Sequence, residues 1–273
     1  MRDEWSHWLD PVRALALEAS ERILEIYGMA FAVTAKDDQS PLTAADLAAH
    51  QAIVAGLQKL TPDLPVLSEE SSAAPFAERS SWRRYWLVDP LDGTKEFVQR
   101  NGQFTVNIAL IDNHEPVFGV VRVPVTGTCY FAARGSGAFR EQPGQPPQPI
   151  SVKPLPAGQP VRVVGSKSHG GPKLQQFAAR LGAYELVTIG SSLKFCQVAE
   201  GSADVYPRFG PTSEWDTAAA QAIVEVAGGR VVSTETGAAL RYNTRESLLN
   251  PSFIVYGDAS RDWLAYVPRE GSV

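Results

Sequence analysis

Residues 86–94, which read WLVDPLDGT, are the segment that most constrains how this chain can fold. The apolar residues predict a strand that delivers Asp89, and the proline after it predicts a turn that brings Asp92 back beside Asp89. The glycine allows a close backbone approach, and Thr94 can begin a helix whose free N–H groups favour an anion. The segment therefore predicts two neighbouring acids between a strand and a helix.

The two carboxylates, together with the backbone carbonyl of Leu91, are hard oxygen ligands of the kind that Mg²⁺ prefers. An isolated D-P-x-D-G segment is more often a turn that only caps a helix, so this reading needs support from other acids. Glu69 and Glu70 follow a predicted strand at 65–68, where functional loops gather, although a pair of glutamates alone is usually a solvated turn.

Asp216 precedes a run of alanines and is predicted to start a helix over 216–227. An aspartate at that position is most often an N-cap. The small residues, however, allow this helix to be packed on every side, which would bury Asp216, and a buried carboxylate without a cation is costly. Shared divalent cations, which can bridge phosphate oxygens and produce a nucleophilic water, explain all the acids together.

The remaining pattern predicts two lobes. Residues 1–150 form an N-terminal α+β lobe that carries most of the acids, with helices at 8–28 and 44–60, strands at 65–68 and 85–88, and an antiparallel meander over 105–131. A proline-rich stretch at 141–149 is a surface loop or lobe boundary. Residues 151–273 form an α/β lobe, because strands at 161–164 and 185–189 alternate with helices at 173–181, 193–200 and 216–227.

Composition excludes several classes of protein. A chain of 273 residues with 44% hydrophobic content can bury a proper core, and its net charge of −5 argues against a general nucleic-acid binder. Cys129 and Cys196 form no metal or redox pair and are expected to be free thiols. The start of the chain does not resemble a signal peptide and no apolar run is long enough to span a bilayer, so we expect a cytoplasmic protein. Peripheral association with the inner face of the cell membrane stays open.

Taken in this order and spacing, Glu69-Glu70, the 89–94 segment and Trp215-Asp216 resemble the inositol monophosphatase superfamily of lithium-sensitive, magnesium-dependent phosphatases. The resemblance covers nearly the whole chain and implies an α/β fold, a layered αβαβα sandwich of the inositol monophosphatase and fructose-1,6-bisphosphatase type. Within the superfamily, segments 43–46, 165–169, 190–195 and 199–208 are similar to the bacterial 3′(2′),5′-bisphosphate nucleotidases of sulfate assimilation.

The resemblance also implies roles for individual residues, with two or three Mg²⁺ ions per active site. Glu70 matches no ligand position. The implied metal ligands are Glu69, Asp89, the Leu91 carbonyl, Asp92 and Asp216. The implied catalytic groups, which orient and deprotonate the attacking water, are Asp46, Thr94 and, through a third and weaker metal, Glu69. The implied substrate-binding residues are Gly93, Thr94, Ser166, His169, Gly190, Lys194 and Arg208.

Three of these substrate residues have ordinary alternatives when each is taken alone. His169 is equally well a surface histidine, Lys194 an exposed helix charge, and Arg208 the ion-pair partner of a nearby acid. Only their joint occurrence in matching segments favours a role in binding.

The function that the resemblance implies is hydrolysis of the 3′-phosphate of adenosine 3′,5′-bisphosphate to AMP and phosphate by a metal-activated water. The partner is thus a small nucleotide, and no nucleic acid is expected. An inositol monophosphatase, a fructose-1,6-bisphosphatase or another sugar-phosphate phosphatase of the same fold is the first alternative. A non-catalytic regulatory or RNA-associated relative is the second, although such proteins usually lack some of the acids. The family contains monomers and homodimers, so the oligomeric state stays open.

Overall fold

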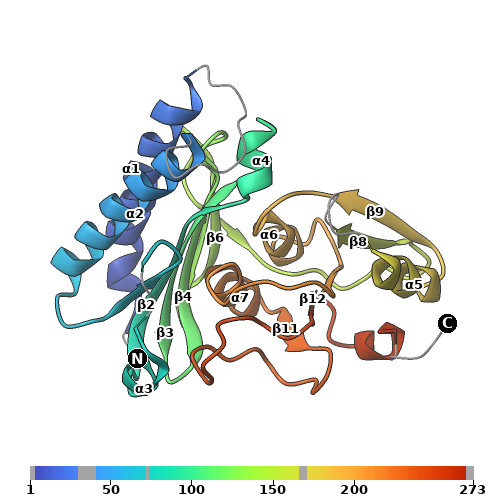
Figure 1. The fold of residues 1–273 in the computed structure, drawn as a ribbon. Helices are drawn as coiled ribbons and strands as arrows, with labels where there is room; N and C mark the ends of the chain where they lie inside the picture. The colour runs from blue at the N-terminus through green and yellow to red at the C-terminus, as the bar shows by residue number, and fades with distance from the viewer. Residues whose placement is uncertain (1–3, 30–40, 72–73, 166–170, 269–273) are drawn as a thin grey trace.

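The computed structural model describes residues 4–29, 41–71, 74–165 and 171–268, and its helices and two sheets are stacked in five layers (Figure 1). A helix pair covers the outer face of a seven-stranded sheet, a second pair lies between this sheet and a five-stranded sheet, and short helices cover the far face. The predicted α/β fold with αβαβα layering is confirmed.

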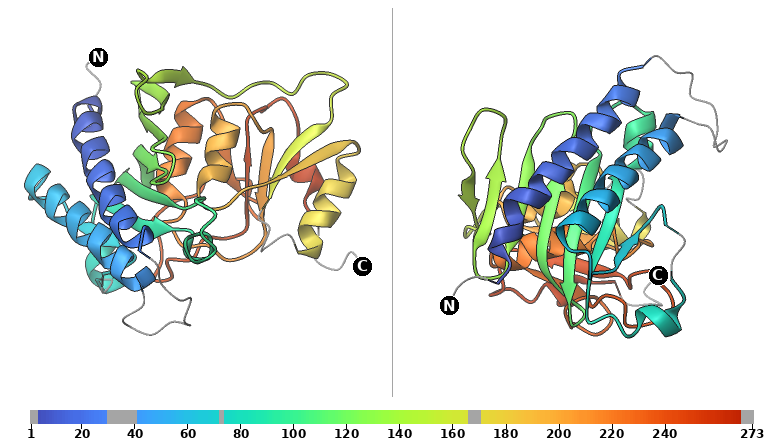
Figure 2. Two further views of the ribbon diagram at one scale, coloured as in Figure 1. Left: turned by 90° about the horizontal axis from the view of Figure 1, so that it is seen from above. Right: turned by 90° about the vertical axis from the view of Figure 1, so that its left-hand side faces the viewer.

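The outer pair consists of α1, Leu9–Tyr27, and α2, Pro41–Leu60, with the 3₁₀ helix η1, Ser6–Trp8, before them. Figure 2 shows the two helices running side by side across the first sheet. Gly56 permits this approach, because a Cβ added there would lie 2.1 Å from a methyl carbon of Leu15. Both predicted helices are confirmed, and α2 begins three residues earlier than expected.

The first sheet has its strands in chain order, with β1 parallel to β2 and every later pair antiparallel. The predicted meander is therefore confirmed. Because helices cover both faces, the central strands are apolar on both sides, and β3 is buried except at its last residue. The strands are β1 Val66–Ser68, β2 Arg84–Asp92, β3 Thr105–Asp112, β4 Glu115–Arg122, β5 Cys129–Ala133, β6 Gly137–Glu141 and β7 Gln148–Ile150.

The proline-rich stretch at 141–149 is only partly the predicted loop, because it ends in β7, which pairs with β6 at the edge of the sheet. Proline is tolerated there since an edge strand has N–H groups that need no partner in the sheet. The chain then passes to the second sheet, so the predicted lobe boundary at 150/151 lies where the chain changes sheet. We keep the division into two lobes as a proposal, because one core cluster takes residues from both halves.

The second sheet has the order β11-β12-β10-β8-β9, in which β8, β9 and β10 run parallel and β12 runs antiparallel to its neighbours. The alternation predicted for this half is confirmed, but β10, β11 and β12 were not predicted. The strands are β8 Val161–Gly165, β9 Tyr184–Thr188, β10 Val205–Arg208, β11 Arg230–Ser233 and β12 Phe253–Tyr256. The helices are α5 Pro172–Arg180, α6 Leu193–Ala199, α7 Ala218–Val226 and the 3₁₀ helix η2 Trp263–Tyr266.

Helix α7 lies at the centre of the molecule, against β4 and β3. Gly119 of β4 makes this possible, because a Cβ there would stand 2.1 Å from the carbonyl oxygen of Ala219. The alanine-rich helix is thus packed closely on the sheet, as predicted. Its predicted start at Asp216 is wrong by two residues, because residues 214–217 form a hydrogen-bonded turn before the helix.

None of the helices in the described ranges combines the length and apolar character that a bilayer span requires.

Candidate active site

Asp89 and Asp92 reach the same face of the first sheet through a β-bulge. Asp89 lies opposite Asn107 and Asp92 opposite Thr105, with a register shift between the two pairs. Residues three apart in a regular strand point to opposite faces, but residues opposite Thr105 and Asn107, which are two apart, must share one face. The predicted turn at Pro90 is therefore wrong, since β2 continues to Asp92, and the bulge produces the same juxtaposition.

Gly93 ends the strand with a φ of 105°, a conformation that favours glycine, and a Cβ there would lie 3.1 Å from the Cβ of Phe104. The short helix α4, Thr94–Val98, begins directly after it. The close backbone approach and the helix start predicted for this segment are both confirmed.

Two further acids converge on the end of β2. One oxygen each from Glu69, Asp89 and Asp216 lies within 4.8 Å of the others, a spacing that could hold a metal ion. Glu69 follows β1, which runs parallel beside β2, and Asp216 lies in the turn before α7. The carboxylate of Asp216 accepts a hydrogen bond from the Ser213 N–H, at 2.9 Å, and does not cap α7, so the N-cap alternative is wrong.

The electrostatics of this cluster are unfavourable for anions alone. Asp89 is only 1% exposed, and burial raises the pKa of its carboxyl well above the usual range. Repulsion by the charges of Asp92, Glu69, Asp216 and Asp46 adds to that rise. Burial and the charge of Asp92 likewise raise the pKa of Asp216 to about 7. Such a group of carboxylates is stable only when protons or a cation reduce its charge.

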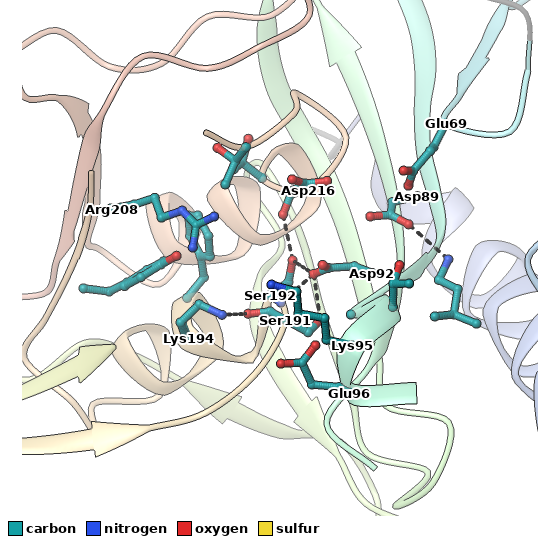
Figure 3. Close-up of a pocket in the computed structure, with 17 residues that line it drawn as sticks. Glu69, Asp89, Asp92, Lys95, Glu96, Ser191, Ser192, Lys194, Arg208 and Asp216 are labelled. Atoms are coloured by element: carbon teal, nitrogen blue, oxygen red, sulfur yellow. Dashed lines mark hydrogen bonds between the residues drawn. The ribbon is translucent and has the colours of Figure 1, made fainter. Parts of the chain in front are cut away.

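Asp92 is held differently, by hydrogen bonds from the loop that precedes α6 (Figure 3). Its Oδ2 accepts from the Ser191 hydroxyl at 2.6 Å, from the Ser192 N–H at 2.7 Å and from the Ser192 hydroxyl at 2.9 Å. None of these bonds goes to Oδ1. A residue from the first half is thus oriented by residues about 100 positions later in the chain.

These acids form one wall of a cavity of about 280 Å³ that residues from both halves line (Figure 3). Five acidic and three basic side chains, the start of α4 and two aromatic rings meet there. The lining residues include Glu69, Asp89, Leu91, Asp92, Gly93, Thr94, Lys95, Glu96, Ser191, Ser192, Lys194, Phe195, Tyr206, Arg208, Thr212 and Asp216.

Lys194 and Arg208 lie opposite the acids. Lys194 is 6% exposed and donates to the Ser191 carbonyl at 2.6 Å, so the alternative of an exposed helix charge is wrong. Burial lowers the pKa of Lys194 to about 8. Arg208 donates to the carbonyl of Pro211 at 2.8 Å and lies in no ion pair identified among the described residues. Both cations therefore border the cavity without an acid that neutralises them directly.

Two predicted site residues do not line the cavity, and two more lie outside the described residues. Asp46 lies buried in α2, and its charge helps to raise the pKa of Asp89. Gly190 packs on Glu96 instead of lining the cavity, and its N–H donates to the Gln103 side chain at 2.9 Å. Ser166 and His169 lie outside the described residues.

Other lining residues were not predicted, notably Ser191, Ser192 and Tyr206. Ser191 and Ser192 directly follow Gly190, and Tyr206 lies two residues before Arg208, so all three lie within segments that carry the resemblance. The local sequence does not indicate that these side chains line the cavity, because contacts such as that of Ser192 with Asp92 join distant parts of the chain.

Known proteins match this chain over most of its length. The model of the inositol monophosphatase family matches residues 4–263. The curated 3′(2′),5′-bisphosphate nucleotidase CysQ of Escherichia coli (strain K12) is 51% identical over 249 residues, which cover 90% of this chain and 98% of the relative. The same-named protein of Haemophilus influenzae is 36% identical over 258 residues, covering 94% and 95% of the two chains.

Solved structures show the same fold. The crystal structure of CysQ from Bacteroides thetaiotaomicron, described as a bacterial member of the inositol monophosphatase family, matches with a TM-score of 0.83 and 43% identity, covering 95% of this chain and all of that one. An inositol monophosphatase from Zymomonas mobilis matches with a TM-score of 0.79 at 22% identity over 97% of this chain and 99% of its own. The latter likeness concerns the fold alone.

Proposed function

This chain belongs to the inositol monophosphatase family, and on that premise we propose that it is a metal-dependent 3′(2′),5′-bisphosphate nucleotidase. It releases the 3′-phosphate of adenosine 3′,5′-bisphosphate as inorganic phosphate and leaves AMP. The names of the relatives with about half of their residues identical support this substrate.

The observation that carries the proposal is the convergence of Glu69, Asp89 and Asp216, whose oxygens lie within 4.8 Å of one another at the wall of a cavity. These acids come from three separate elements of the chain. The burial of Asp89 and the mutual repulsion of the three acids would be a pure cost unless a cation were bound between them.

The donor set fits Mg²⁺, because carboxylate and carbonyl oxygens are the ligands that this hard cation prefers. Glu69, Asp89, the Leu91 carbonyl, Asp92 and Asp216 would hold two or three ions. Bound there, Mg²⁺ polarises phosphate oxygens and lowers the pKa of a bound water.

The chain's own groups would place the reactants. Asp46 and Thr94, with Glu69, orient the attacking water and take its proton. The N–H groups of Gly93 and Thr94 receive the phosphate that is cleaved. This scheme requires no serine or cysteine nucleophile, so water attacks in line with the bond to the leaving oxygen.

The second half of the chain would recognise the rest of the nucleotide. Lys194 and Arg208 border the cavity across from the acids and can pair with the phosphate that is retained. Ser166, His169 and Gly190 complete this side in the proposal. We also propose that the halves 1–150 and 151–273 act as two lobes around the cavity, and that the protein is a cytoplasmic monomer or homodimer. No described feature supports membrane association.

The test is phosphate release from adenosine 3′,5′-bisphosphate, inositol 1-phosphate and fructose 1,6-bisphosphate, each with Mg²⁺, with EDTA and with added lithium. We expect fastest release from the nucleotide with Mg²⁺, none with EDTA, and inhibition by lithium. A preference for inositol 1-phosphate would replace the substrate but keep the mechanism. No release from any substrate would contradict the enzyme itself.

A further inference from the structure

Two polar residues of β3 are buried where the strand would otherwise be apolar. Thr105 and Asn107 are 0% and 1% exposed, and their neighbours on the same face, Ala109 and Ile111, belong to the core beneath α6 and α7. A buried amide that lacks partners is costly, so these side chains need a polar partner. Neither is a predicted metal or substrate residue.

Their partners are the residues that orient the acids. The Asn107 amide N–H donates to the Ser192 hydroxyl at 3.0 Å and lies 3.5 Å from Asp92 Oδ2. The other end of the same amide, its Oδ1, accepts from the Thr105 hydroxyl at 3.0 Å. Thr105 in turn contacts the hydroxyl of Ser191.

Ser192 connects the two halves of the site. Its hydroxyl lies 2.9 Å from Asp92 Oδ2 and 2.7 Å from the backbone carbonyl of Asp216 (Figure 3). One hydroxyl carries one proton, so it can donate to only one of these acceptors at a time. The Asn107 N–H occupies a lone pair of the same oxygen and thereby limits how the hydroxyl can turn.

We propose that Asn107 is a positioning residue for the metal site. Acting through Ser192, Asn107 directs Asp92 so that Oδ1 faces the cation position. Through the same hydroxyl it holds the main chain of Asp216 at a set distance from Asp92. The inference rests on the proposed function, since it assigns Asn107 a part in metal binding. Residues that orient metal ligands typically change metal affinity by about 10–100-fold when they are removed.

The test is Mn²⁺ affinity, measured by titration without substrate, in Asn107→Leu, which has nearly the same shape but no hydrogen-bonding groups. We expect an affinity loss of about 10–100-fold. At saturating Mn²⁺, kcat for adenosine 3′,5′-bisphosphate should recover largely towards that of the wild type. Ser20→Ala is the matched control, because that buried hydroxyl donates only within α1, to the Ala16 carbonyl at 2.7 Å. It should leave Mn²⁺ affinity unchanged.

A double variant tests whether Asn107 acts through Ser192. If it does, Asn107→Leu/Ser192→Ala should bind Mn²⁺ no more weakly than Ser192→Ala alone. If Asn107→Leu does not fold, Thr105→Val removes the hydroxyl that Asn107 accepts from, and a smaller affinity loss is expected. Unchanged Mn²⁺ affinity together with a lowered melting temperature in EDTA would overturn the inference and leave Asn107 a structural residue. Wild-type protein that binds Mn²⁺ but releases no phosphate would instead contradict the proposed function.

Discussion

Strands β3 and β9 are both rich in apolar residues, yet they meet very different surroundings. In β3 the residues from Thr105 to Ile111 are all buried, because helices lie on both faces of the first sheet. In β9, at the edge of the second sheet, Tyr184, Leu186 and Val187 are 42%, 49% and 42% exposed. Asp89 and Asp92 lie on β2, which is buried except at its two ends, whereas the predicted substrate residues Gly190 and Lys194 follow the exposed edge strand β9. The metal side of the cavity should therefore be the more rigid.

The largest difference is expected in the free energy of unfolding when a leucine is replaced by alanine in each strand. Leu110→Ala on β3 should lower the free energy of unfolding by about 2–5 kcal/mol, since it leaves a cavity in a fully packed core. Leu186→Ala on β9 should change that free energy by only about 0.5 kcal/mol, because half of the side chain is already in water. Urea unfolding measures both. Similar losses in the two variants would show that the second sheet is as tightly packed as the first.

A smaller difference is expected between substitutions of two neighbouring glutamates, of which Glu69 lines the cavity and Glu70 does not. Glu69→Gln should reduce kcat/KM by about 10²–10³-fold, a loss typical of one removed group that stabilises the transition state. Glu70→Gln is the matched control and should stay close to the wild type, because Glu70 matches no ligand position and does not line the cavity. Equal losses would mean that the ligand at this position has been assigned incorrectly.

Lys194→Met tests the other side of the cavity. Loss of one charge-assisted hydrogen bond, worth about 1.5–3 kcal/mol, should raise KM for adenosine 3′,5′-bisphosphate by roughly 10–100-fold. KM for 3′-AMP, which lacks the second phosphate, should change much less. Steady-state kinetics with both substrates measures the difference, and equal increases would remove Lys194 from substrate recognition.

The same lysine predicts a dependence on pH. Burial lowers its pKa to about 8, so the ammonium is present below that pH and is lost above it. KM of the wild type for the bisphosphate should therefore rise as pH increases through about 8, while KM of Lys194→Met stays flat there. A rise of the same size in the variant would assign the titration to another group.

Local patterns were enough to predict the elements that carry strong periodicity. The helix over 8–28 was recognised from its apolar spacing and is α1, and the meander was recognised from turn residues between apolar runs. The acids were also found, because their residue types and spacing indicate cation binding whatever the surrounding fold.

Features that depend on distant contacts could not be predicted in this way. The bulge after Asp89 exists because β2 pairs with β3, so a proline that predicts a turn lies instead in a strand. Lys194 resembles a surface charge by type, and only the packing of α6 shows that it is buried. The contact of Ser192 with Asp92 likewise requires the two sheets to be assembled around α7.

The central claim is that these acids come together at a cost that a bound divalent cation removes. Thermal unfolding of Asp89→Asn beside the wild type, in EDTA and in Mg²⁺, tests it most directly, since asparagine keeps the acceptor for the Leu91 N–H and removes only the charge. We predict that in EDTA the variant melts above the wild type, and that Mg²⁺ raises the melting temperature of the wild type but hardly that of the variant. A variant that melts at or below the wild type in EDTA and gains equally from Mg²⁺ would contradict the account.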